Sequence, residues 1–200
     1  MKKLVLATSN RGKVAEMQPL LSDIGYSIVT QSEMGVGDAI EDGHTFVENA
    51  LIKARHASAV TGLPAIADDS GLIIDALKGA PGLISAHYAG VHGDARGNIE
   101  KVLAELNGVP ASQRSARFYS LIVMLKHAED PQPLIAEGIW EGEILDAPRG
   151  ENGFGYDPIF YVPEHRCSAA ELPAELKNTI SHRGRALLKL RELLNTRITG

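Results

Sequence analysis

The sequence is poor in cysteine and has no long apolar run, and both shortages narrow the class of protein. Cys167 is the only cysteine among the 200 residues, so no disulfide can form within the chain and the reducing cytoplasm is the expected location. No apolar stretch approaches the roughly 20 residues that a membrane-spanning helix needs. The apolar residues 4–7 after Met1-Lys2-Lys3 are also too few for the core of a signal peptide. We therefore expect a cytoplasmic protein that does not bind membranes.

Positive charge is also in short supply. Lysine and arginine number 20 against 25 aspartates and glutamates, which gives a formal net charge of −5. A general nucleic-acid surface is basic, so stable nucleic-acid binding is not expected, although a local basic pocket for a small polyanion stays open. Hydrophobic residues make up 44% of the chain, which is enough for a sizeable core. The length indicates one domain over residues 1–200, in which two lobes can share one sheet.

The most informative stretch is residues 65–71. An apolar run after Pro64 predicts a buried strand, and it ends in Asp68-Asp69-Ser70-Gly71. Open α/β sheets bind their ligands at such strand ends. Because neighbouring side chains of a strand point to opposite faces, Asp68 and Asp69 are expected to differ in role, one facing a ligand and the other tying down local structure. Taken alone, the stretch is equally compatible with a plain turn.

The first predicted helix begins with basic residues, directly after a strand over residues 3–7, and its apolar positions extend to Ile24, before Gly25 ends it. Cations at a helix N-terminus oppose the helix dipole, and glycine weakens a helix. A bound anion would remove the conflict, because N–H groups and an ammonium group would converge on it. Phosphate binding is therefore favoured over an ordinary capped helix, although the pattern is not a Walker loop. The residues concerned are Thr8, Ser9, Asn10, Arg11, Gly12 and Lys13.

The last predicted helix has the same feature. Ser181 is its expected N-cap, and its first turn contains His182, Arg183 and Arg185, with Lys177 just upstream. This is a second helix start that makes sense mainly with an anion or a hydrogen-bond acceptor nearby.

A glycine-rich stretch at residues 150–158 forms a further polar centre. Phe154 lies between two glycines and is followed by Asp157. Glycines allow unusual backbone conformations, so the aromatic ring can stack on a flat ligand while the backbone binds its edge. A tight turn with a core aromatic residue fits the same pattern.

The rest of the sequence predicts an α/β fold with a mixed β-sheet, and no linker separates the N-terminal and C-terminal halves of the chain. Residues 34–43 form an acidic loop whose Asp38, Glu41 and Asp42 are either solvated or reach a cation, and the helix 45–61 places Asn49 and Lys53 on one face. Further strands are expected over residues 26–31 and 159–162, and residues 71–77 are expected to continue the central strand. A long hairpin is expected to pair residues 116–126 with 134–145. Further helices are expected over residues 94–106 and 169–177, the second broken by Pro173.

These motifs together resemble the inosine triphosphate pyrophosphatase family, whose bacterial members are the dITP/XTP pyrophosphatases, also called noncanonical purine NTP pyrophosphatases. Each motif is only moderately specific, but the whole set in this order is highly specific and covers essentially the whole chain. The matching segments are residues 8–13, 46–50 with Lys53, 67–72, 79–82, 153–158, Lys177 and 180–184.

The resemblance implies an elongated mixed β-sheet flanked by helices in three α/β/α layers, with the active-site cleft between two lobes, and a homodimer. It implies Mg²⁺-dependent hydrolysis of the α–β phosphoanhydride bond of ITP, dITP and XTP to the monophosphate and pyrophosphate. Such an enzyme removes these nucleotides from the pool, so that they are not incorporated into DNA or RNA. Its partners are small purine nucleoside triphosphates.

Residue roles follow from the resemblance at matching positions. Asp69 binds metal and acts as general base, and Glu41 is a second metal ligand. Residues 8–13 and Lys53 hold phosphates, and Ser70 contacts substrate. Many family members have arginine where this chain has His87, so the resemblance does not assign the contact of that arginine to His87. The residues expected to surround the nucleotide are Phe154, Gly155, Tyr156, Asp157, Lys177, His182 and Arg183.

Two alternatives remain. A Maf-like pyrophosphatase would perform the same class of reaction on other nucleotides, and the segment Ser181-His182-Arg183 argues against it. A nucleotide-binding regulator without turnover would not need Asp69 and Glu41, both of which are present.

Overall fold

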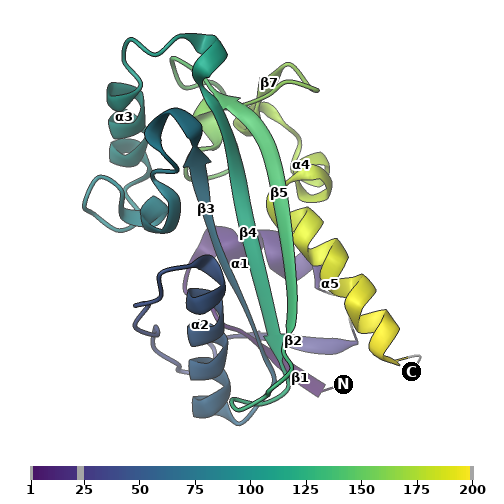
Figure 1. Ribbon diagram of the computed structural model, residues 1–200. Helices are drawn as coiled ribbons and strands as arrows, with labels where there is room; N and C mark the ends of the chain where they lie inside the picture. The colour runs from purple at the N-terminus through teal and green to yellow at the C-terminus, as the bar shows by residue number, and fades with distance from the viewer. Residues whose placement is uncertain (1, 22–24, 199–200) are drawn as a thin grey trace. The chain divides into compact units, whose positions relative to one another are not determined.

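The computed structural model describes residues 2–21 and 25–198, and in this part of the chain seven strands form one sheet of order β2-β1-β3-β4-β5-β6-β7 (Figure 1). β1 runs parallel to β2 and β3, whereas β6 is antiparallel to β5 and β7, so the sheet is mixed as predicted. The strands are β1 Lys2–Leu6, β2 Tyr26–Thr30, β3 Ala65–Ile74, β4 Ser115–Leu125, β5 Leu134–Ile144, β6 Phe160–Val162 and β7 Cys167–Ser168.

The helices begin where the sequence places capping residues. Thr45 accepts a hydrogen bond from the Glu48 backbone N–H at 3.3 Å, and Gly62 ends that helix in a left-handed conformation. The helix that follows Ser181 is confirmed, and so is the break at Pro173. The helices are α1 Arg11–Leu20, α2 Phe46–Thr61, α3 Ala95–Glu105, α4 Ala174–Ile180 and α5 His182–Ile198.

One expected strand end was wrong, and one expected helix end lies outside the described residues. The extended stretch predicted through Leu77 ends at Ile74, because residues 75–77 form a 3₁₀ turn that the Lys78 N–H closes on the Asp75 carbonyl at 3.0 Å. α1, which was expected to include Ile24, ends at Leu20, and residues 22–24 are not described. Within the described residues, no helix is long and apolar enough to cross a membrane.

Contacts between Cα atoms divide the chain into two compact units. The first unit comprises the described residues of Met1–Asp69, Ser120–Gly138 and His182–Gly200, and the second comprises Ser70–Tyr119 and Ile139–Ser181. The strands β3, β4 and β5 contribute residues to both. The expected single domain and the cleft that the resemblance implies stay predictions.

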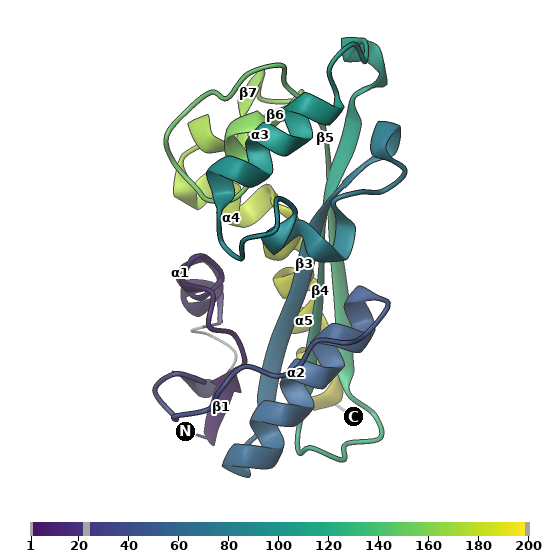
Figure 2. The same ribbon diagram turned by 90° about the vertical axis from the view of Figure 1, so that its left-hand side faces the viewer.

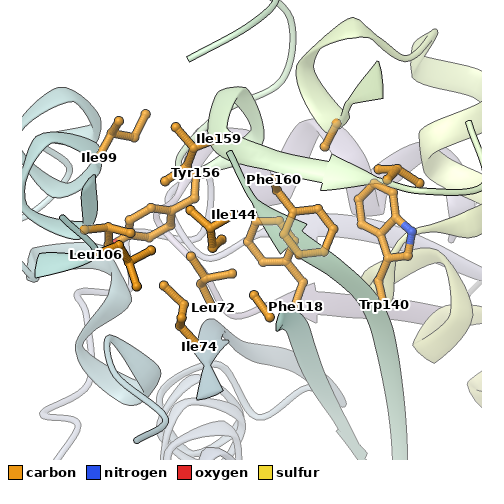
Figure 3. Close-up of a cluster of buried hydrophobic side chains, with 14 of the residues drawn as sticks. Leu72, Ile74, Ile99, Leu106, Phe118, Trp140, Ile144, Tyr156, Ile159 and Phe160 are labelled. Carbon is orange, nitrogen blue, oxygen red and sulfur yellow. The ribbon is translucent and has the colours of Figure 1, made fainter. Parts of the chain in front are cut away.

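Each unit has its own apolar core. In the first unit, α1 and α5 cover the strands, and the predicted stripe of α5 is confirmed by the burial of Leu187 and Leu190. In the second unit, the rings of Phe118, Trp140 and Phe160 pack together, with centroid separations of 4.5 Å for Phe118–Phe160 and 5.2 Å for Trp140–Phe160 (Figure 3). Aromatic residues are 5% of the chain, and much of their stabilising contact is concentrated here.

Gly138 of β5 allows the first turn of α5 to lie directly on the strand. A Cβ atom at this position would be 2.0 Å from the His182 carbonyl oxygen and 2.6 Å from the Ala186 nitrogen. Both of these are backbone atoms, which cannot move away as a side chain can. The absence of a side chain at residue 138 therefore fixes where His182 and Arg183 begin the helix.

The substitution Gly138→Ala should lower the free energy of unfolding by about 1–3 kcal/mol, because the new methyl group displaces α5. Gly37→Ala is the matched control, since a Cβ atom there would meet nothing within 4 Å. Urea unfolding of both variants tests the effect. Equal stability of the two variants would contradict the close approach of α5.

Candidate active site

The carboxylate of Asp68 is the most completely enclosed charge of the first unit. It lies in β3 with 0% exposure, 2.9 Å from Lys13 Nζ and 3.1 Å from Arg183 Nη2, and it accepts a hydrogen bond from the Ser120 hydroxyl. Burial alone would raise the pKa of Asp68, but Arg183 and Lys13 hold it well below its usual value. Asp68 is therefore ionised and joins α1, β4 and α5 to the central strand.

Each of the two cations around Asp68 makes a second contact; the side chain of Arg183 is 2% exposed and that of Lys13 is 14% exposed. Lys13 Nζ also donates to the Asp68 carbonyl oxygen at 3.3 Å, and burial lowers the pKa of Lys13 although Asp68 opposes the shift. Arg183 also pairs with Glu16 of α1. The guanidinium group thus connects the first turn of α5 and the middle of α1 to β3.

Asp69 has different partners. Its Oδ1 atom lies 2.6 Å from Lys53 Nζ, and the same ammonium group lies 2.8 Å from Glu41 Oε2. Burial raises the pKa of Asp69, with Lys53 and Lys13 opposing the shift. Adjacent carboxylates with separate partners are what the alternation of an extended strand predicts. α2, which carries Lys53, lies alongside this part of β3 (Figures 1 and 2).

Glu41 and Asp69 are the carboxylates that the resemblance assigns to a divalent cation. They already share one cation, the Lys53 ammonium group. Among the described residues, no cluster of three or more histidine, cysteine, aspartate or glutamate side chains could hold a metal ion. Mg²⁺ typically binds one or two carboxylates together with substrate phosphates, so this two-carboxylate set fits a metal that arrives with a polyanion.

Residues 8–13 connect β1 to the first turn of α1. Asn10 caps the helix by accepting from the Lys13 backbone N–H at 3.1 Å, and Thr8 Oγ1 accepts from the Asn10 N–H at 3.2 Å. The Ser9 hydroxyl donates to Asp38 at 3.1 Å. Arg11 is exposed, whereas Lys13 is directed to Asp68. The helix start thus has the predicted local structure, and its role in phosphate binding stays a prediction.

In the second unit, Phe154, Asp157 and Lys177 form a compact polar group. Lys177 Nζ is 2.6 Å from Asp157 Oδ2 and 5.2 Å from the centre of the Phe154 ring. The Phe154 N–H donates to the same carboxylate oxygen at 2.8 Å. Gly153 has a φ of +76°, and a Cβ atom there would be 2.1 Å from Asp157 Oδ2. The turn therefore needs glycine at 153 and leaves Phe154 37% exposed, outside the core.

Other predicted site residues lie in different surroundings. Tyr156 is a core residue whose hydroxyl donates to the Ser85 carbonyl at 2.8 Å, and burial raises the pKa of its phenol. Ser70 is half-buried in β3, and Gly155 adopts a positive φ of +62°. His182 is buried in the first turn of α5.

Sequence reasoning missed two residues of this site, Glu16 and Ser120. Each contacts a residue far away in the chain, Arg183 and Asp68 respectively. Glu16 resembles any solvated helix residue and Ser120 any strand residue, so no local signal marks them.

The two aspartates should differ in their effect on stability. Asp68→Asn should lower the free energy of unfolding by about 3–5 kcal/mol, because it leaves buried cations without their anion. Asp69→Asn should cost clearly less, since Lys53 keeps Glu41 as a partner. Urea unfolding at neutral pH compares the two. A larger loss for Asp69→Asn would show that the structural carboxylate has been misassigned.

Comparison with known proteins identifies the relatives of this chain. The model of the Ham1 family matches residues 4–193. The dITP/XTP pyrophosphatase of Vibrio cholerae is 58% identical over 95% of both chains, and that of Xylella fastidiosa is 60% identical over 98% of both. The solved structure of a HAM1 protein from Coxiella burnetii has a TM-score of 0.90 at 54% identity and covers 98% of this chain and 100% of its own. A second, the Ham1 protein of Staphylococcus aureus, has a TM-score of 0.86 at 40% identity, with the same coverage. The chain belongs to the Ham1 family.

Proposed function

We propose that the protein is a nucleoside triphosphate pyrophosphatase that hydrolyses the noncanonical purine nucleotides ITP, dITP and XTP to the monophosphate and pyrophosphate. One observation carries the proposal: adjacent positions of β3 present two carboxylates, each paired with a lysine, beside the N-terminal turn of α1. Relatives of 57–60% identity that bear the name dITP/XTP pyrophosphatase support it. The cellular role would be to keep such nucleotides out of DNA and RNA.

Glu41 and Asp69 are the proposed ligands of Mg²⁺, and Lys53 is the proposed phosphate contact beside them. The bound metal ion would draw negative charge from the phosphate oxygens. The Lys53 ammonium group, which lies between both carboxylates, is placed to neutralise phosphate charge as well.

The first turn of α1 is the proposed phosphate site. Its N–H groups and the positive end of the helix dipole favour an anion. We assign this role to residues 8–13, with the ammonium group of Lys13 held in place by Asp68.

Asp69 is the proposed general base for the attacking water. Burial raises its pKa, which makes it a better proton acceptor than an exposed aspartate. The water oxygen attacks the α-phosphorus, its proton passes to the Asp69 carboxylate, and pyrophosphate leaves. Ser70, the next residue of β3, is the proposed neighbouring substrate contact.

The purine base is assigned to a second set of residues. Phe154 would stack on the ring, and Asp157 or the backbone around it would accept a hydrogen bond from N1–H of hypoxanthine or xanthine. His182 and Arg183 would donate to the keto oxygen at C6, where adenine carries an amino group. The ion pairs of Arg183 with Asp68 and Glu16 give it a second, structural role. Gly155, Tyr156 and Lys177 complete this proposed set.

We also propose a cytoplasmic homodimer without stable nucleic-acid or membrane binding. The net charge of −5 argues against stable nucleic-acid binding, and the single cysteine fits a reducing compartment. The homodimer is what the family resemblance implies.

Hydrolysis in oxygen-18 water tests the reaction. With a divalent cation present, ITP should give pyrophosphate, and the label should enter the monophosphate because attack at the α-phosphorus places the new oxygen there. Label in pyrophosphate, or orthophosphate as the direct product, would contradict the assignment. Pyrophosphate release from a panel of triphosphates separates the alternatives. A Maf-like enzyme would prefer other nucleotides, and a nucleotide-binding regulator would release no pyrophosphate from any of them.

His182→Ala should narrow the preference for ITP over ATP about tenfold, because a donor to the keto oxygen is lost; such a hydrogen bond contributes on the order of 1–3 kcal/mol. Arg185→Ala is the control, since Arg185 is an exposed cation of the same helical turn. Steady-state kcat/KM on both substrates measures the change. An equal loss on ITP and ATP would place base discrimination elsewhere.

A further inference from the structure

The loop that carries Glu41, residues 34–43, has little apolar packing of its own. Val36 is buried, but Glu41 is exposed and Ile40 is 84% exposed. No strand or helix includes the loop. Its position therefore depends on a few polar contacts.

Those contacts lie on both sides of Glu41. Before it, Asp38 Oδ2 accepts from the Ser9 hydroxyl at 3.1 Å, and Asp38 Oδ1 accepts from Gln31 Nε2 at 2.5 Å. After it, the Gly43 N–H donates to Asn49 Oδ1 at 2.9 Å. His56 Nε2 lies 3.0 Å from the Gly37 carbonyl oxygen and ties the loop to α2.

Glu41 itself pairs with Lys53 Nζ at 2.8 Å, and among the contacts on either side of Glu41 those of Asp38 are made by a charged group. A carboxylate is an acceptor at both oxygens, and hydrogen bonds to a charged group are roughly twice as strong as neutral ones. Gln31 is 4% exposed, and its backbone N–H donates to the Leu6 carbonyl at 3.0 Å, so it provides a fixed point at the end of β1. Ser9 lies in the turn before α1.

We propose that Asp38 is a positioning residue that fastens the Glu41 loop to residues 8–13, and so sets the distance between a metal-binding carboxylate and the phosphate-binding turn. This proposal rests on the proposed function of that site. The Ser9 hydroxyl has a single proton, and in this arrangement it is used for the link to Asp38. Ser9 then contributes to phosphate binding through its backbone.

The test compares Asp38→Asn with Asp42→Asn. An asparagine at 38 keeps the size of the side chain but removes its charge, so the links to Ser9 and Gln31 become neutral hydrogen bonds of roughly half the strength. Asp42 is exposed in the same loop, and its substitution removes the same charge. Any effect of charge alone should therefore appear in both variants.

Two readouts are needed. In the metal-free protein, hydrogen exchange of the peptide covering residues 34–43 should be severalfold faster in Asp38→Asn and unchanged in Asp42→Asn. The dissociation constant for Mn²⁺ in the presence of pyrophosphate, measured by calorimetry, should rise about tenfold in Asp38→Asn, as is typical when an outer partner of a ligand is lost. The kcat of Asp38→Asn at saturating metal should stay within about twofold of the value for the unsubstituted protein, which distinguishes a positioning residue from a catalytic one.

Unchanged hydrogen exchange in Asp38→Asn, or equal effects of both substitutions, would overturn the proposal. If no triphosphate yields pyrophosphate, the proposed function fails. The exchange measurement still decides whether Asp38 holds the loop, because it needs neither metal nor substrate.

Discussion

The first unit depends on one buried interaction, the pairing of the Asp68 carboxylate with Lys13 and Arg183. A charge in a protein interior is costly unless oppositely charged groups and hydrogen bonds surround it. Here the partners come from α1 and α5, and Ser120 adds a donor from β4. Because Arg183 also pairs with Glu16 in the middle of α1, the first turn of α5 is joined to α1 as well as to β3. The position of the first turn of α1 therefore depends on the contact of Lys13 with the ionised Asp68 carboxylate.

The two adjacent aspartates of β3 have different environments. Asp68 is held ionised by two cations, and its side chain is wholly enclosed. Asp69 has a raised pKa and shares Lys53 with Glu41, on a loop that polar contacts hold in place. The two aspartates lie inside β3 rather than at its end, and they can have different partners because successive residues of a strand point to opposite faces. The enclosed carboxylate of Asp68 supports the scaffold, while Asp69 is the one to which we assign the proposed metal and proton-transfer roles.

Much of the local structure followed from the sequence, because periodicity, caps and glycine stops act over short distances. The helices expected over 45–61 and 94–106 and the hairpin of β4 and β5 are examples. What could not be predicted depends on residues distant in the chain. Nothing local shows that Arg183 pairs with Glu16, or that Tyr156 is a core residue whereas Phe154, two positions earlier, is exposed. Burial of that kind is decided by tertiary packing.

A double-mutant cycle between Asp68 and Arg183 tests the central claim most directly. Asp68→Asn, Arg183→Met and the double variant are unfolded in urea, and their losses of stability are compared. If the buried pair organises the site, the double variant should lose at least about 1 kcal/mol less than the sum of the single variants, since partners in one network couple by 0.5–3 kcal/mol. Additive losses would show that Asp68 and Arg183 act independently, and the account of the first unit would then be wrong.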